Sequence, residues 1–122
     1  MANYWKLYKE VRLFFQTSWE IICPVHKIRI RLSRHGLRHM LQKKRAQRHI
    51  PDQIRRFKLF LSMTEILHDP GLKMAQNNSF TILSLATDQR FIKIVLAQDG
   101  IGIYRFISIM EHKARRAPKG SS

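Results

Sequence analysis

Two histidines stand four residues apart in the most basic part of the chain. His35 and His39 fall one turn apart on one face of a helix, and Arg38 lies beside them. Because the pKa of histidine lies near neutral pH, such residues can remove the 2′-hydroxyl proton of RNA or protonate the departing 5′-oxygen. A neighbouring arginine can stabilise the charge that develops on the phosphate. Metal-independent phosphodiester cleavage is therefore one chemistry that this segment can support.

The same pair has simpler interpretations that the sequence leaves open. Two histidines on a basic surface helix are often only solvated, or they contact phosphate without transferring a proton. The spacing of His35 and His39 also suits a zinc ion, but no third ligand is evident. We therefore predict no metal site and no cofactor.

The last third of the chain adds four candidates. Arg105 interrupts an aliphatic alternation, and Ser108 interrupts an aromatic one. Lys93 stands among apolar residues of the preceding strand, and His112 ends the last strand. A cation that faces an apolar surface either extends to an edge or lines a cleft. We expect His112 to be the distant histidine that a sheet brings near a site.

The charge of the chain is strongly asymmetric. The 122 residues include 23 Lys and Arg against 8 Asp and Glu, a formal charge of +15. Residues 27–58 hold 12 of the cations and a single acid, Asp52, so +11 of the +15 lies there. Such charge favours nucleic acid, an anionic membrane surface or an acidic protein as partner. The candidate RNA-binding residues are Lys27, Arg29, Arg31, Arg34, Arg38, Lys43, Lys44 and Arg45.

Several classes of protein are disfavoured by what the sequence lacks. It contains no dinucleotide-binding, P-loop, nucleophile-elbow or zinc-protease motif. Its acids are too sparse for a two-carboxylate glycosidase or a multi-carboxylate magnesium nuclease. The single cysteine, Cys23, excludes an internal disulfide framework. No segment predicts stable membrane insertion.

The N-terminal region predicts an amphipathic helix. Apolar side chains recur at a spacing near 3.6 over residues 4–22, and Pro24 ends the pattern. The helix either packs on the sheet or presents a docking face for a partner, formed by Trp5, Tyr8, Phe15 and Trp19.

A strand and a helix are predicted next. Over residues 25–32, mainly basic side chains alternate strictly with mainly apolar ones, which indicates a half-buried strand with a basic outer face. Ser33 is a suitable N-cap for a helix that runs to about residue 47. Its inward residues are expected to be Leu37, Met40 and Leu41.

A further helix begins near Pro51, because proline suits the first turn. It is expected to stop at residues 68–71. The expected inward residues are Ile54, Phe57, Leu61, Thr64 or Glu65, and Leu67.

After Gly71 the hydrophobic period changes to two, which predicts an antiparallel meander. The expected strands are 79–86, 91–97 and 101–110, with a weaker one over 72–76. Turns are expected at 87–90 and 98–100, the second with Gly100 at positive φ. The fold class is α+β, with N-terminal helices followed by a small antiparallel sheet.

The order of these elements resembles a group of small ribonucleases, the barnase–EndoU–colicin–RelE-like (BECR) superfamily of phage and toxin type. The resemblance rests on the segments "SRHGLRHMLQKK", "EILHDPG" and "YRFISIMEH". In particular, His35, the turn at 67–70 and Ser108 match the group's pattern. The resemblance implies metal-independent RNA cleavage that leaves a 2′,3′-cyclic phosphate, often in tRNA or mRNA.

The sequence therefore favours an endoribonuclease toxin, with three parts. Residues 1–25 would form the N-terminal amphipathic helix, 26–112 the ribonuclease-like domain and 113–122 a basic flexible tail. His35 is expected to act as base or acid with His39 or His112 as its partner. The phosphate would be held by Arg38, Lys93 and Arg105 and oriented by Ser108.

Partners and compartment follow from the same hypothesis. An acidic immunity or antitoxin protein would cover the basic surface, and the expected compartment is the cytoplasm, including the cytosol of a target cell. The alternative is a basic nucleic-acid-binding protein without catalysis, associated with a ribosome or a phage. Charge alone supports both hypotheses equally.

Overall fold

The protein has the α+β architecture that the sequence predicts. The computed structural model describes residues 2–43 and 46–113. In chain order the elements are α1 (Ala2–Thr17), β1 (Glu20–Cys23), β2 (Ile28–Arg31), α2 (Arg34–Leu41), β3 (Gln42–Lys43), β4 (Ala46–Gln47), α3 (Ile50–Leu61), α4 (Met63–Leu67), β5 (Lys73–Asn77), β6 (Phe80–Ala86), β7 (Arg90–Gly100) and β8 (Ile103–Lys113). The predicted strands of the second half are confirmed.

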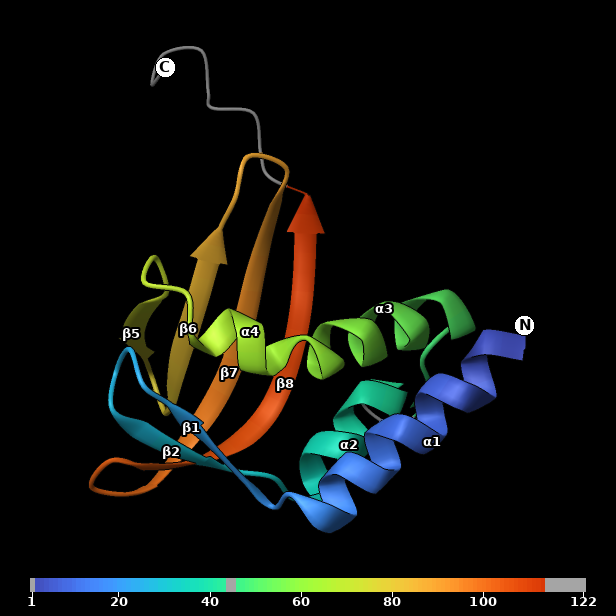
Figure 1. The fold of residues 1–122 in the computed structure, drawn as a ribbon, viewed down its shortest axis with the longest axis horizontal. Helices are drawn as coiled ribbons and strands as arrows, with labels where there is room; N and C mark the ends of the chain where they lie inside the picture. The colour runs from blue at the N-terminus through green and yellow to red at the C-terminus, as the bar shows by residue number, and fades with distance from the viewer. Residues whose placement is uncertain (1, 44–45, 114–122) are drawn as a thin grey trace.

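One curled sheet organises the molecule, with the strand order β1-β2-β8-β7-β6-β5. All neighbouring strands are antiparallel except β2 and β8, which are parallel. The helices α1, α2 and α3 gather beside β8, and α4 crosses in front of the sheet (Figure 1). The meander predicted from the period of two is thus extended by a hairpin from the first third of the chain.

The pairing of β2 with β8 is short. It joins residues 29–31 to residues 103–105, so no strand covers the edge of β8 beyond Arg105 in the described chain. The helices α2 and α3 pack against β8 there instead. This edge matters because unpaired strand groups need other hydrogen-bond partners when they are buried.

An aromatic contact joins the helices to this part of the sheet. Phe60 of α3 stacks on Phe15 of α1 at 4.8 Å between ring centroids, and it meets Phe106 of β8 edge-on at 5.5 Å. Phe60 and Phe106 are both fully buried. Burying a phenylalanine contributes about 1.5–3 kcal/mol, so this contact helps to fix α1 and α3 against β8.

The predicted N-terminal helix is too long, because α1 ends at Thr17 and residues 20–23 form β1. In β1, Ile21 and Cys23 are buried while Ile22 is exposed, and the strand pairs with β2. The β-branched pair Ile21–Ile22 therefore follows the period of a strand. The expected helical face is also broken, since Trp5 and Trp19 are exposed and Tyr4 and Val11 are buried.

The second predicted helix is too long as well. The helix α2 ends at Leu41, and residues 42–43 and 46–47 form a two-stranded hairpin. Gln42 takes extended backbone angles, and the N–H of Arg48 donates to the carbonyl of Leu41 at 2.8 Å. The backbone donor of Arg48 thus closes the hairpin. Met40 is fully buried, as predicted, with Leu37 and Leu41 packed against the core.

Three smaller expectations are corrected. The strand predicted over 25–32 begins only at Ile28, because Lys27 adopts a φ of 55° in the preceding turn. Thr64 and Glu65 are exposed, whereas Met63 and Ile66 are buried. The helix is also divided at Ser62 into α3 and α4, which shifts its inward face by one residue.

The turn before the last strand is also displaced. Gly100 lies within β7, and the positive φ, 71°, belongs to Gly102. The hairpin therefore turns two residues later than expected, and β7 reaches eleven residues.

Gly36 is the point where α2 comes closest to the sheet, and it yields a test. A Cβ there would lie 2.5 Å from the Phe106 ring and 2.9 Å from its carbonyl oxygen. Helix propensity alone predicts that Gly36→Ala stabilises the fold by about 1 kcal/mol. We expect the opposite, a loss of about 1–3 kcal/mol in the free energy of unfolding by urea denaturation.

Gly100→Ala is the matched control, because its added Cβ has no neighbour closer than 3.8 Å. We expect it to change the free energy of unfolding by less than about 1 kcal/mol. A stabilised Gly36→Ala variant would contradict the close approach of α2 to β8.

Candidate functional site

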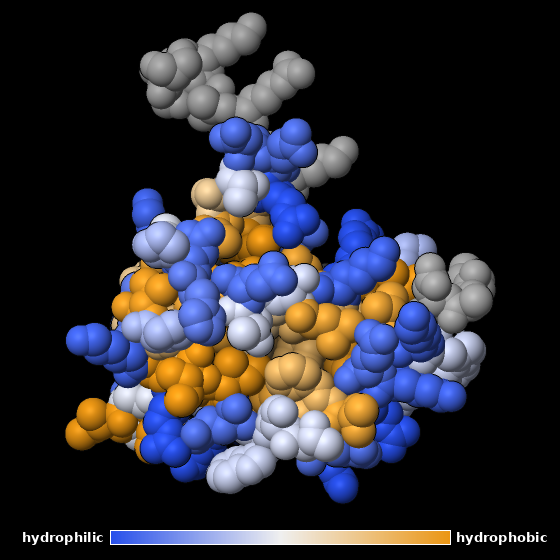
Figure 2. Space-filling view, viewed as in Figure 1, coloured by the Kyte–Doolittle hydropathy of each residue, from blue (hydrophilic) through white to orange (hydrophobic). Residues whose placement is uncertain are grey.

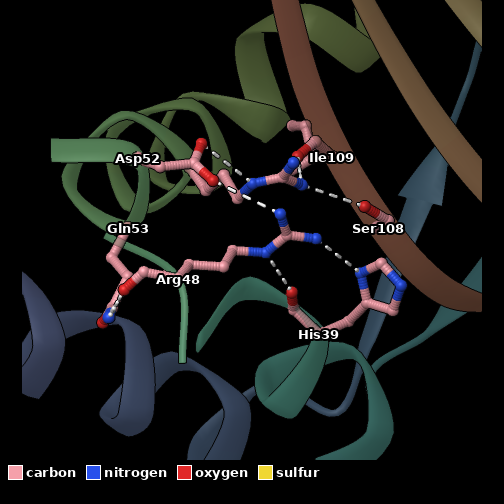
Figure 3. Close-up of polar contacts among 7 residues, drawn as sticks. His39, Arg48, Asp52, Gln53, Ser108 and Ile109 are labelled. Atoms are coloured by element: carbon pink, nitrogen blue, oxygen red, sulfur yellow. Dashed lines mark hydrogen bonds and ion pairs between the residues drawn. The ribbon is translucent and has the colours of Figure 1, made fainter. Parts of the chain in front are cut away.

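An arginine from α3 covers the unpaired edge of β8. The Nη1 atom of Arg56 donates to the carbonyl oxygen of Ile109 at 2.8 Å and to Oγ of Ser108 at 3.2 Å. Figure 3 shows Ser108 and Ile109 on the strand facing the arginine groups. The guanidinium thereby supplies a donor that a neighbouring strand would otherwise supply.

Two arginines share one carboxylate at this position. Oδ2 of Asp52 lies 3.3 Å from Nη1 of Arg48, and Oδ1 lies 3.3 Å from Nε of Arg56. The side chains of Arg48, Asp52 and Arg56 are 6%, 34% and 11% exposed. Burial, followed by the charge of Arg48, lowers the pKa of Arg56 from its ordinary value. The group therefore holds one positive charge more than its carboxylate balances.

Arg48 extends this cluster to one of the two histidines. Its Nε donates to the carbonyl oxygen of His39 at 2.9 Å, and its Nη2 lies 3.5 Å from Nδ1 of the ring (Figure 3). The backbone contact fixes Arg48, while the ring contact is weak.

A buried glutamine connects the cluster to α1. Nε2 of Gln53 donates to the carbonyl oxygen of Arg48 at 2.7 Å, and its Oε1 accepts from the hydroxyl of Tyr4 at 2.6 Å. Gln53 is completely buried. The backbone of Arg48 is therefore held from α1 as well as from α3.

The environment of His39 disfavours the protonated form of its ring. Burial, then the charges of Arg48 and Arg56, and then His35, lower the pKa of His39 below 6.5. The ring centroids of His35 and His39 lie 6.2 Å apart, so the predicted adjacency on one helix face is confirmed. His35 is exposed, whereas His39 is half-buried.

We define the histidine–arginine cluster as His35, His39, Arg48, Asp52 and Arg56. Its excess positive charge favours a bound anion, and its neutral imidazole can accept a proton. Among the described residues, no group of three His, Cys, Asp or Glu side chains could hold a metal ion.

Two of the other predicted catalytic residues lie next to this cluster. Ser108 is buried and accepts a hydrogen bond from Arg56. His112 is exposed, and it lines a small cavity of about 170 Å³ together with Asp52 and Arg56. The last strand thus brings Ser108 and His112 to the neighbourhood of the cluster.

The remaining two lie elsewhere in the sheet. Lys93 sits in β7 in register with Ser84 and Met110. Arg105 forms an ion pair with Asp99, with 3.5 Å between Nε and Oδ1. Neither of them hydrogen-bonds to the cluster within residues 2–43 and 46–113.

The predicted RNA-binding residues whose side chains are described lie on two parts of the structure, β2 with the turn before it and α2. Along the outer side of β2 and its turn, Lys27, Arg29 and Arg31 are exposed, and Arg29 pairs with Glu20 at 2.9 Å. Arg34 and Arg38 are exposed on α2. Hydrophilic side chains stand out over the helical end of the face drawn in Figure 2.

Some of the predicted RNA-binding residues and the predicted tail fall outside the part of the chain that the structure describes. Lys44 and Arg45 lie outside the described residues, as do residues 114–122 of the predicted tail. Lys43 ends β3, but its side chain is likewise outside what is described.

The residues that the sequence analysis missed are the arginines of the cluster and their acid. Arg48, Asp52 and Arg56 follow one another at four-residue spacing, which places an acid between two cations on one side of a helix. That spacing was a usable signal. The carbonyl oxygen of Ile109, which accepts a hydrogen bond from Arg56, belongs to a residue more than fifty positions further along the chain. No local pattern in the sequence predicts that contact.

Comparison with protein-family models, with curated proteins and with solved structures finds no match for this chain. The resemblance to the BECR group therefore stays a prediction. In the part of the chain that the structure describes, no helix is both long and apolar enough to cross a membrane.

Arg56 provides the test of this arrangement. Arg56→Ala would leave the carbonyl of Ile109, the hydroxyl of Ser108 and one side of Asp52 without a donor. We expect the free energy of unfolding to fall by about 3 kcal/mol in urea denaturation, as when one partner of a buried ion pair is removed.

Arg55→Ala is the control, because Arg55 is the exposed neighbour on the same helix and carries the same charge. Its effect should stay within about 0.5 kcal/mol. Equal effects of the two substitutions would show that Arg56 does not support the edge of β8.

Proposed function

We propose that the protein binds RNA and cleaves it without a metal ion at the histidine–arginine cluster. The observation that carries this proposal is the pairing of a neutral, half-buried His39 with an exposed His35, beside two buried arginines that only one carboxylate neutralises. A phosphodiester supplies the negative charge that the cluster lacks. The two histidines supply the two proton-transfer groups.

The cleavage step follows from the positions of the protons. In the base role, the unprotonated ring nitrogen of His39 takes the 2′-hydroxyl proton. The 2′-oxygen then attacks phosphorus, and the bond to the 5′-oxygen breaks. Protonated His35 gives its proton to that 5′-oxygen. The products are a 2′,3′-cyclic phosphate and a 5′-hydroxyl.

His112 is a second candidate for the acid. It lines the small cavity beside Asp52 and Arg56 and is exposed at the end of β8. His35 and His112 are therefore alternatives for this role.

RNA binding without cleavage is the second candidate function. It is favoured by the contacts of Arg56, whose Nε and Nη1 donors are directed at protein acceptors. In this alternative the arginines are structural, and exposed cations such as Arg34 and Arg38 bind phosphate.

The biological setting forms part of the proposal. A toxin of this type acts on tRNA or mRNA in a cytosol, and its charge of +15 favours an acidic immunity or antitoxin protein as partner. Complementary charge on such a partner would accelerate its association with the basic surface.

Incubation with total tRNA and with a structured mRNA in EDTA tests the proposed cleavage. We expect discrete fragments that end in a 2′,3′-cyclic phosphate. His35→Ala and His39→Ala should each lower the cleavage rate about 100-fold or more, as expected for loss of a proton-transfer group. His49→Ala is the control, since His49 is exposed and lies outside the cluster.

Two results would overturn this assignment. Intact RNA together with a salt-sensitive gel shift would establish binding without cleavage. Unchanged cleavage by both histidine variants, with the wild-type circular dichroism spectrum, would place the reaction elsewhere.

A further inference from the structure

A groove lies between α1 and α2, and the cluster histidines do not line it. It encloses about 750 Å³, within the range of small-ligand sites. Three arginines line it, Arg12 from α1 and Arg34 and Arg38 from α2, and no acidic residue does. Its charge therefore fits an anionic ligand.

The same groove has an apolar side suited to a planar ring. Tyr8 and Phe15 line it, and each contacts a buried phenylalanine, while the guanidinium of Arg12 lies over the Tyr8 ring, 5.8 Å from its centroid. Phe15 stacks on Phe60 at 4.8 Å, and Tyr8 lies 6.1 Å from Phe57 between ring centroids. These contacts hold both rings in place before any ligand arrives. Aromatic rings of this kind are the usual platforms on which proteins stack single-stranded bases.

Further polar groups in the groove have unused hydrogen-bonding capacity. Oγ of Ser33, at the start of α2, is shielded from solvent and has no hydrogen-bond partner among the described residues. Gln16 and Gln42 also line the groove, and an amide can pair with the edge of a base.

The groove lies next to the two histidines on the same helix. Successive residues of an α-helix are about 100° apart, so Arg34 and Arg38 adjoin His35 and His39 along two neighbouring stripes of α2. A polymer bound along the first stripe can therefore present its next phosphodiester to the second.

We propose that the groove between α1 and α2 is a nucleotide subsite that holds one base and its phosphate next to the phosphodiester presented to His35 and His39. This inference rests on the proposed function, since it takes RNA as the ligand. The base packs on Phe15 beside Tyr8, and the phosphate is held by the three arginines. The N-terminal helix is thus part of the RNA-binding surface.

Binding of a short, fluorescein-labelled 2′-O-methyl oligoribonucleotide, followed by anisotropy, tests the subsite. This probe lacks the 2′-hydroxyl and is not cleaved, so binding is measured apart from catalysis. We expect Arg12→Gln and Arg38→Gln each to lower affinity about fivefold or more and to reduce the slope of log K against log salt by about 0.7, the value for one phosphate on a single strand.

Lys9→Gln is the matched control, because Lys9 is an exposed cation of α1 that does not line the groove. The affinity of this variant should stay within about twofold of the wild type, because Lys9 does not line the groove and an exposed charge is screened by salt. An abasic version of the probe should bind wild-type protein about fivefold or more weakly, because base stacking is lost.

The outcomes separate the two proposals. If wild-type protein binds the probe but Arg12→Gln and Arg38→Gln behave like Lys9→Gln, the subsite is wrong and the proposed function stands. Equal affinity for the abasic probe would also overturn the subsite, because no base would then be held. If wild-type protein binds no RNA at all, the proposed function fails, and the subsite fails with it.

Discussion

The hydrogen bond from Arg56 to the carbonyl of Ile109 is the interaction on which the rest of the site depends. A buried strand edge needs partners for its backbone groups, and β2 covers β8 only as far as Arg105. Two helices close the remainder. Gly36 lets α2 approach the backbone at Phe106, and Arg56 of α3 donates to the edge further along.

The buried charge of Arg56 at the edge of β8 affects the titratable groups around it. Asp52 balances only one of the two buried arginines, and the nearby His39 cannot easily gain a proton in the same space. The lowered pKa of His39 therefore reflects its burial first and then the two arginines that cover the edge of β8. Structure and proposed chemistry share the same side chains, so we expect a substitution there to affect stability as well as the proposed cleavage.

Local patterns in the sequence predict which helices and strands form better than they predict the residues at which each begins and ends. The period of two identified the meander, and the proline at position 51 marked the start of α3, because these signals act within a few residues. Residues 20–23, 42–43 and 46–47 are predicted as helix but form strands, because pairing with β2 or within a hairpin decides their conformation. Tertiary pairing of this kind overrides local periodicity.

For the candidate site too, local spacing was predictable and contacts between distant parts of the chain were not. The adjacency of His35 and His39 follows from helical spacing and was predictable, and Arg48 and Asp52 carried a spacing signal that went unused. The role of Arg56 depends on Ile109, a contact between distant parts of the chain. The central claim is that burial and the charges of Arg48 and Arg56 together lower the pKa of His39. An NMR titration of the His39 ring tests it most directly: we expect a midpoint below 6.5, and a midpoint at or above 6.5 would contradict it.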